Sequence, residues 1–213
     1  MSSAEVVCIF PLPQVALFPH AILPLHVFEP RYREMVRDCL AGDRKMAVAA
    51  LEPGYESTYH QRPAVRSVCG VGELVAHEAL ADGRSNILLR GLQRGRIVDE
   101  LPPVERYRRV RWQPMDDRLP PGFDEPRALS SLILLADQVA LKLPSGAETL
   151  RELARSQATP GPLTDVLAAA LVTDPDERQS LLEETDIGAR VERVSARLAA
   201  ILLDFSERRG PAN

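Results

Sequence analysis

The sequence predicts an α+β chain with two parts, a β pseudo-barrel with one helix (residues 1–117) followed by a helical bundle (residues 118–213). Three observations predict this fold class. Short apolar runs separated by glycine and proline fill the first part, as in small barrels. Apolar residues at three- and four-residue spacing fill the second part, as in bundles. Residues 114–122 are rich in turn formers and separate the two parts.

The strands of the first part are predicted from local signals. Val6–Phe10 is a short apolar run, and the prolines after it restrict residues 11–24 to an edge strand or an irregular crossover, because proline lacks the N–H that a central strand donates. An Asp-Gly turn at residues 81–84 predicts a hairpin. The remaining strands are expected at residues 46–51, 68–78, 86–89, 91–98 and 107–112.

Helices are predicted from apolar spacing and from start signals. Pro30 suits the first turn of a helix whose apolar face recurs every three or four residues, and Gly42 marks its end. In the second part, an apolar stripe from Ala128 to Leu143 indicates a long helix. Shorter helices are expected after Ser145, over residues 163–171 and after Asp174, and a final helix from Asp186.

Composition and charge narrow the class of protein. The 213 residues are 45% hydrophobic and 26% charged, as in globular proteins, and the formal net charge is −4. No apolar run approaches the ~18 residues of a spanning helix. Residues 1–5 lack the basic start of a signal peptide. We therefore expect a cytoplasmic protein with no membrane partner.

The sequence lacks the motifs of metal and nucleotide chemistry. Cys8, Cys39 and Cys69 have no C-x-x-C spacing, which predicts buried, reduced thiols rather than a disulfide framework or a zinc site. Neither Lys45 nor Lys142 lies in a phosphate-cradling loop. Spacing leaves a Ser-Lys pair open, but Lys142 is better explained as a surface charge on a helix. We expect no catalytic residue, no metal and no cofactor.

One proline-rich stretch resembles a known family. Residues 10–13 (Phe-Pro-Leu-Pro), 17–19 (Leu-Phe-Pro) and 23–32 resemble the Lon N-terminal substrate-binding domain family, in a short standalone form. The resemblance implies a PUA-like pseudo-barrel followed by helices, without the ATPase and Ser-Lys protease domains of full-length Lon. The family often has glycine where this chain has His20, and histidine tolerates positive φ less well.

The resemblance implies a non-catalytic polypeptide-binding module, an adaptor or a chaperone-like binder of unfolded segments. Protein or peptide segments are the expected partners, and the oligomeric state stays open. Rigid prolines and aromatics lose little entropy on binding, so an exposed rim of them suits broad recognition. The alternative is that these residues fill the core. The candidate residues are Phe18, Pro19, Leu23, His26 and Phe28.

Two polar clusters are predicted to be structural rather than functional. A carboxylate and a guanidinium at a strand–helix junction favour a charge-assisted hydrogen bond, and an Asp-Gly pair favours a tight turn. The two clusters are Glu29, Arg31 and Tyr32 at the junction, and Asp82, Gly83 and Arg84 in the turn.

Two other functions stay open. Residues 105–112 interleave four arginines with two aromatics, a pattern that suits single-stranded RNA. Against RNA binding, residues 1–117 hold 15 basic and 15 acidic residues, so they carry no net charge. The second open function is that of a hydrolase or peptidase. In that case the label is inherited from full-length Lon, and this chain has no such activity of its own.

Overall fold

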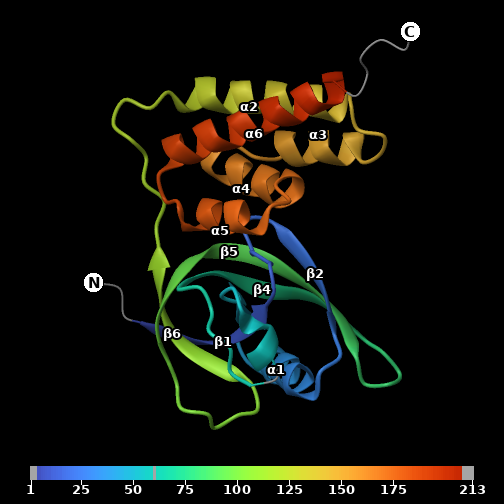
Figure 1. The fold of residues 1–213 in the computed structure, drawn as a ribbon, viewed down its shortest axis with the longest axis vertical. Coiled ribbons are helices and arrows are strands. Elements are labelled where there is room, and N and C mark those ends of the chain that lie inside the picture. The colour runs from blue at the N-terminus through green and yellow to red at the C-terminus, as the bar shows by residue number, and fades with distance from the viewer. Residues whose placement is uncertain (1–3, 60, 208–213) are drawn as a thin grey trace. The chain divides into compact units, whose positions relative to one another are not determined.

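The computed structural model describes residues 4–59 and 61–207 and has the predicted α+β fold (Figure 1). Six strands and seven helical segments are found in these residues. The strands are β1 Glu5–Leu12, β2 Ile22–Val27, β3 Lys45–Ala50, β4 Val68–Ala79, β5 Ser85–Glu100 and β6 Arg108–Met115. The helices are α1 Pro30–Ala41, the 3₁₀ turn η1 Tyr55–Thr58, α2 Glu125–Ala140, α3 Ala147–Arg155, α4 Pro160–Leu171, α5 Pro175–Glu183 and α6 Ile187–Glu207.

The chain divides into two compact units. The first unit contains Met1–Asp116 and Pro175–Glu183, and the second contains Asp117–Asp174 and Glu184–Asn213. The sequence assigned residues 175–183 to the bundle, whereas the structure joins α5 to the sheet. Polar bonds explain this difference: Gln179 Nε2 donates to the Val68 carbonyl at 3.1 Å, and Arg94 Nε donates to the Leu182 carbonyl at 3.0 Å.

The sheet of the first unit closes into a barrel. Its strand order is β2-β5-β4-β3-β1-β6, and β5 also pairs with β6. The long strand β5 makes the closure possible, because residues 85–90 pair with β2 whereas residues 94–100 pair with β6. Within the described residues β5 is the only neighbour of β2, so Pro24 lies in an edge strand, where a missing N–H is tolerated. The predicted pseudo-barrel is confirmed.

The proline-rich crossover before β2 lies directly on the sheet. A Cβ atom at Gly91 would come within 1.9 Å of the Phe18 carbonyl oxygen, and Gly70 has a similarly close neighbour in Leu17. The backbone N–H of His20 donates to the Gly91 carbonyl at 2.9 Å. Gly70 and Gly91 therefore make room for another backbone. A register shift does occur beside Gly72.

The apolar core of the first unit lies on both sides of β1 and β3. Helix α1 lies beside the strands (Figure 1), and Met35 and Val36 of its predicted face are members of one cluster. Alternate residues such as Ile9 and Ala47 point into the other cluster, which surrounds Trp112. The members of the first cluster are Phe10, Leu17, Val27, Tyr32, Met35, Val36, Cys39, Met46, Val48, Leu74, Ile87 and Leu89.

The second unit is a helical bundle with a buried ion pair. Arg190 on α6 is 1% exposed, and its two terminal nitrogens donate to the Asp117 carboxylate at 2.7 and 2.5 Å. Its Nε donates to Thr164 at 3.2 Å and lies 3.7 Å from the buried Asp165 carboxylate. Burial alone would lower the pKa of Arg190, but these acidic neighbours outweigh it and raise the pKa. The guanidinium is therefore a charged structural centre, which the sequence analysis did not identify.

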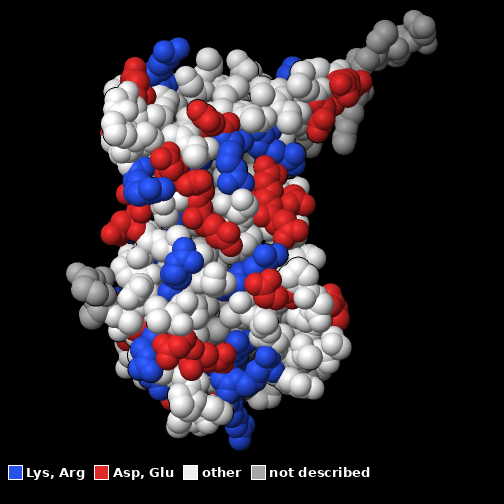
Figure 2. Space-filling model, turned by 60° about the vertical axis from the view of Figure 1, so that its left-hand side comes forward, with Lys and Arg blue, Asp and Glu red and all other residues white. Residues whose placement is uncertain are grey.

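Surface charges of both signs are interspersed. On the face drawn in Figure 2, lysines and arginines alternate with acidic side chains rather than forming one large basic patch. Within residues 4–59 and 61–207, no helix combines the length and the apolar character needed to cross a membrane.

Candidate functional site

Three strands at one end of the sheet carry an apolar outer surface. The register pairs Pro24 on β2 with Leu88 on β5, and Leu88 with Ala76 on β4. The neighbouring residues Ile87 and Leu89 point into the core, since successive side chains on a strand face opposite ways. The row of Pro24, Leu88 and Ala76 therefore faces outward.

Other large apolar residues enlarge this row. Ile22 is 53% exposed, Leu88 38% and Val75 39%. Val75 is the extra residue of a β-bulge between Leu74 and Ala76, and the exposed end of β4 begins at this residue. We call Ile22, Pro24, Val75, Ala76 and Leu88 the outer β2–β5–β4 face. A hollow of ≈ 560 Å³ lies on these strands, and Pro24, Leu88 and Ala76 are among its lining residues.

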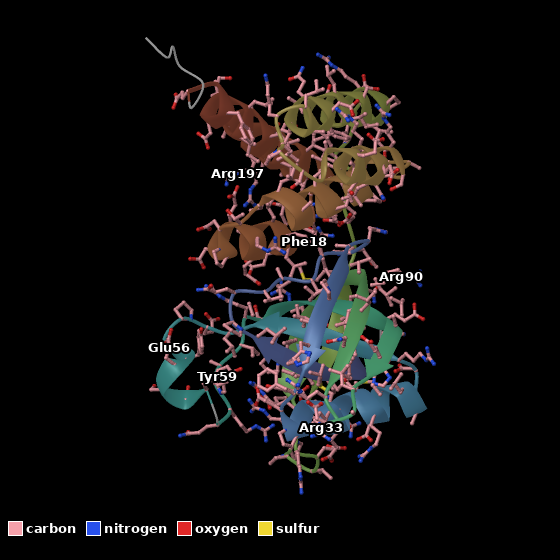
Figure 3. All side chains as sticks on the ribbon, turned by 90° about the vertical axis from the view of Figure 1, so that its right-hand side faces the viewer. Phe18, Arg33, Glu56, Tyr59, Arg90 and Arg197 are labelled. Atoms are coloured by element: carbon pink, nitrogen blue, oxygen red, sulfur yellow. The ribbon has the colours of Figure 1, made fainter. Side chains whose placement is uncertain are left out.

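Polar side chains border the face at both ends. At one end, His26 Nδ1 and Asn86 Oδ1 are 2.8 Å apart, and Asn86 Nδ2 donates to Glu78 at 2.9 Å. At the other end, Arg90 Nη2 donates to Glu73 at 2.7 Å, and Figure 3 shows Arg90 extending away from the sheet. The polar groups thus bond to one another across the strands, which fixes the borders and leaves an uncharged centre.

Two of the predicted rim residues are not on the surface. Phe18 has no exposed area and Pro19 is also buried, so the expectation that they form an exposed rim is wrong. The cause is the close packing of their backbone on β5 at Gly91. The Arg178 guanidinium of α5 also lies 5.5 Å from the centre of the Phe18 ring (labelled in Figure 3). Phe18 and Pro19 are therefore packed on β5 and are not part of an exposed rim.

The other three predicted residues are more accessible. Leu23 is half-buried and packs against the core cluster beneath the sheet, so it is not part of an exposed rim. His26 is exposed and lines the hollow. Phe28 is 58% exposed, and its ring stacks on His26 at 6.2 Å between centroids. His26 and Phe28 therefore lie at one end of the outer face.

The sequence analysis missed Ile22, Val75 and Leu88. The signal for Leu88 was present as alternation, because Asn86, Leu88 and Arg90 all point outward. Ile87–Leu89 is a continuous apolar run, which is typical of a strand that is buried on both faces. The alternation is therefore not evident from hydrophobicity alone.

The junction before α1 is held by a compact polar cluster. Arg31 Nε donates to Glu29 Oε2 at 2.9 Å, and the Arg31 guanidinium lies 4.5 Å from the centre of the Tyr32 ring. Tyr59 donates to the other Glu29 oxygen at 3.4 Å. Burial raises the pKa of Tyr32 to about 12. These groups bond to one another and none is positioned as a reactive pair.

The hairpin between β4 and β5 contains a self-contained turn. Gly83 has a φ of +80°, the left-handed conformation that favours glycine. Asp82 accepts the Arg84 backbone N–H at 3.0 Å and its Nε at 2.6 Å. The backbone bond lowers the pKa of Asp82. The turn fixes the hairpin register and hence the alignment of Leu88 with Ala76.

The arginines that suggested RNA binding have acidic neighbours. Each is paired across the strands, with a nearby loop or with α1, so it has less to gain from a phosphate group. The pairs are Arg106 with Glu34 at 3.8 Å, Arg108 with Glu100 at 2.8 Å, Arg109 with Glu105 at 2.6 Å and Arg111 with Asp99 at 2.9 Å.

Metal-ligating side chains do not gather in the described part of the chain. Among those residues, no group of three or more His, Cys, Asp or Glu side chains is arranged to hold a metal ion. The chemistry that the outer face supports is therefore contact with apolar groups and hydrogen bonding at its borders.

A family model and several curated proteins match most of this chain. The model of a family described as ATP-dependent protease La (LON) substrate-binding domain matches residues 6–200. Among curated proteins, Lon protease of Dictyoglomus thermophilum is 24% identical over 90% of this chain and 24% of its own length. Lon protease 2 of Myxococcus xanthus is 27% identical over 89% of this chain and 23% of its own length. The chain thus spans about a quarter of the length of these relatives.

Solved structures show the same fold. The N-terminal domain of Lon protease from the Mycobacterium avium complex aligns with a TM-score of 0.67 at 15% identity, over 92% of this chain and 98% of that domain. A Lon N-terminal domain protein from Xanthomonas campestris aligns with a TM-score of 0.62 at 25% identity, over 90% of this chain and 98% of that one.

Proposed function

The chain belongs to the family of ATP-dependent protease La (LON) substrate-binding domains, and we propose that it binds extended apolar segments of unfolded polypeptides without cleaving them. The outer β2–β5–β4 face is the proposed contact surface. The observation that carries the proposal is the set of exposed apolar side chains Ile22, Val75 and Leu88 on neighbouring strands, where Leu88 also lines a hollow of ≈ 560 Å³. Contiguous apolar surface of this kind marks interaction sites on folded proteins.

The shape of the face suits a chain without a fixed sequence. Pro24 and the paired strands beneath it are rigid before binding, so little conformational entropy is lost when a segment docks. The centre of the face offers no charge, and the polar groups at its borders are bonded to one another. Recognition therefore depends on apolar contact, which favours weak and broad binding of unfolded segments.

The proposed role is that of an adaptor or a chaperone-like binder. Its relatives are Lon proteases about four times as long, and the match covers their substrate-binding part. In the proposed role these residues hold unfolded segments for proteolysis or protect them, without cleaving them. A cytoplasmic location fits the three free thiols, which are typical of reducing compartments.

Binding is tested with a fluorescently labelled, reduced and carboxymethylated protein that cannot fold. Its anisotropy is titrated with the wild type and with Leu88→Glu, which places a charge at the centre of the face. The matched control is Val98→Glu, because Val98 lies on the same strand, is 54% exposed and is outside the face. We expect Leu88→Glu to raise Kd at least about tenfold and Val98→Glu to leave it nearly unchanged. Equal effects of the two variants would refute the placement of the site.

The non-catalytic part of the proposal needs a separate experiment. Purified protein is incubated with casein, with and without ATP and Mg²⁺, and the products are followed by gel electrophoresis and mass spectrometry. We expect intact casein under both conditions. Sustained cleavage that copurifies with the protein through two chromatographic steps would show that the chain is an enzyme.

A further inference from the structure

Two cysteines that are far apart in sequence meet in the first unit. Cys8 lies on β1 and Cys39 on the last turn of α1, and their sulfur atoms are 3.0 Å apart. Both thiols also point at the Lys45 carbonyl oxygen, at 3.6 and 3.4 Å respectively. Cys39 is buried, whereas Cys8 is partly accessible to solvent. The fold therefore holds a partly exposed cysteine and a buried cysteine with their sulfur atoms in direct contact.

The geometry suits a covalent bond better than a shared metal. A disulfide has an S–S distance of about 2.05 Å, so the two sulfurs need to approach by on the order of 1 Å. A tetrahedral metal site needs further ligands, and the described residues contain no group of three or more metal-ligating side chains. Cys69 is not a third member, because its thiol donates to the Gly95 carbonyl at 3.5 Å in the other core cluster.

We propose that Cys8 and Cys39 are a dithiol modification site, which low-molecular-weight disulfides of the glutathione type oxidise reversibly to an intramolecular disulfide. The Cys8 thiolate first attacks the reagent, forming a mixed disulfide and releasing one reagent thiolate. The Cys39 thiolate then attacks Cys8 Sγ and releases the second. In total, the two protein thiols lose two protons and two electrons, and the reagent disulfide becomes two thiols.

The reaction is slow at neutral pH. The hydrogen bond from Cys39 and burial raise the pKa of the Cys8 thiol, so little thiolate is present to begin the exchange. The site therefore stays reduced under ordinary cytoplasmic conditions and closes only on sustained exposure to oxidised thiols. Once formed, the bond ties β1 to α1, which are 31 residues apart at this point.

The test begins with the reduced wild-type protein, incubated with glutathione disulfide at pH 8 for several hours. Free thiols are then alkylated, and the protein is digested without reduction and analysed by mass spectrometry. We expect a peptide pair joined through Cys8 and Cys39 that disappears after treatment with a reductant. We also expect the oxidised protein to unfold at a temperature higher by on the order of 5 °C, since the cross-link restricts the unfolded chain.

Two variants separate the proposed pair from nonspecific oxidation. Cys39→Ser lacks the second thiol, so Cys8 is expected to stop at the mixed disulfide with glutathione. Cys69→Ser is the matched control, because Cys69 is buried elsewhere, and it is expected to form the Cys8–Cys39 bond like the wild type. The proposal is overturned if wild-type Cys8 carries only glutathione, if it links to Cys69, or if both thiols remain reduced. Because these outcomes are measured on the wild-type protein, they test the proposal even if a variant does not fold.

Discussion

Replacing Gly91 by alanine tests how the crossover before β2 is held on the sheet. The added Cβ would lie 1.9 Å from the Phe18 carbonyl oxygen, whereas ordinary contacts begin at 3.4 Å, so the two backbones have to separate by about 1.5 Å. This movement strains two bonds: Gly91 N–H to the Ala21 carbonyl at 2.8 Å, and His20 N–H to the Gly91 carbonyl at 2.9 Å. Overpacking together with weakened buried hydrogen bonds costs about 2–5 kcal/mol.

The free energy of unfolding is measured by urea denaturation, followed by circular dichroism and by the fluorescence of Trp112, which is buried in the same unit. Gly42→Ala is the control, because Gly42 has a φ of −107° and a Cβ there would meet nothing closer than 3.4 Å. We expect the control to lie within about 1 kcal/mol of the wild type. If Gly91→Ala is no more destabilising than Gly42→Ala, the close approach of the two backbones does not determine how this segment packs.

Three further substitutions test other contacts. His20→Gly is expected to stabilise the protein by about 1 kcal/mol, because His20 has a φ of +64°, and an unchanged melting temperature would contradict this. Arg190→Leu is expected to cost about 3–5 kcal/mol in urea denaturation, because it removes the buried cation that is paired with Asp117 and lies 3.7 Å from the Asp165 carboxylate. Arg155→Leu serves as its control and costs less than about 1 kcal/mol, because the Arg155 side chain is 60% exposed. Arg31→Ala is expected to lower the melting temperature by a few degrees with no change in Kd for unfolded polypeptide. The reverse result would assign Arg31 to the binding site.

Local sequence signals predicted the elements of this fold well, because each signal acts within one turn or strand. Pro30 begins α1, the Asp-Gly turn joins β4 to β5, and Pro24 lies in an edge strand. These features depend on the conformational limits of proline and glycine, which are the same in any context.

Features that depend on long-range contacts were not visible in the sequence. The pattern of α5 predicts a helix but not its partners, and the bonds of Gln179 and Arg94 decide that it joins the sheet. In the sequence, Arg190 cannot be distinguished from other helical arginines, because only the fold places Asp117 and Asp165 beside it. Cysteine spacing detects motifs within a few residues, and the pair at residues 8 and 39 lies outside that range.

The candidate site was only partly predictable, because apolar character alone does not indicate which way a side chain faces. Phe18 and Phe28 are the same residue type and both follow prolines or apolar residues, yet Phe18 is enclosed and Phe28 is 58% exposed. Phe18 is enclosed because its backbone packs on β5 at Gly91. Within β2, the residue-by-residue pairing with β5 sends Leu23 inward and Pro24 outward. A shift of one residue would exchange the two faces. The register that the 81–84 turn and the bulge at Val75 impose therefore determines which apolar residues a partner can reach.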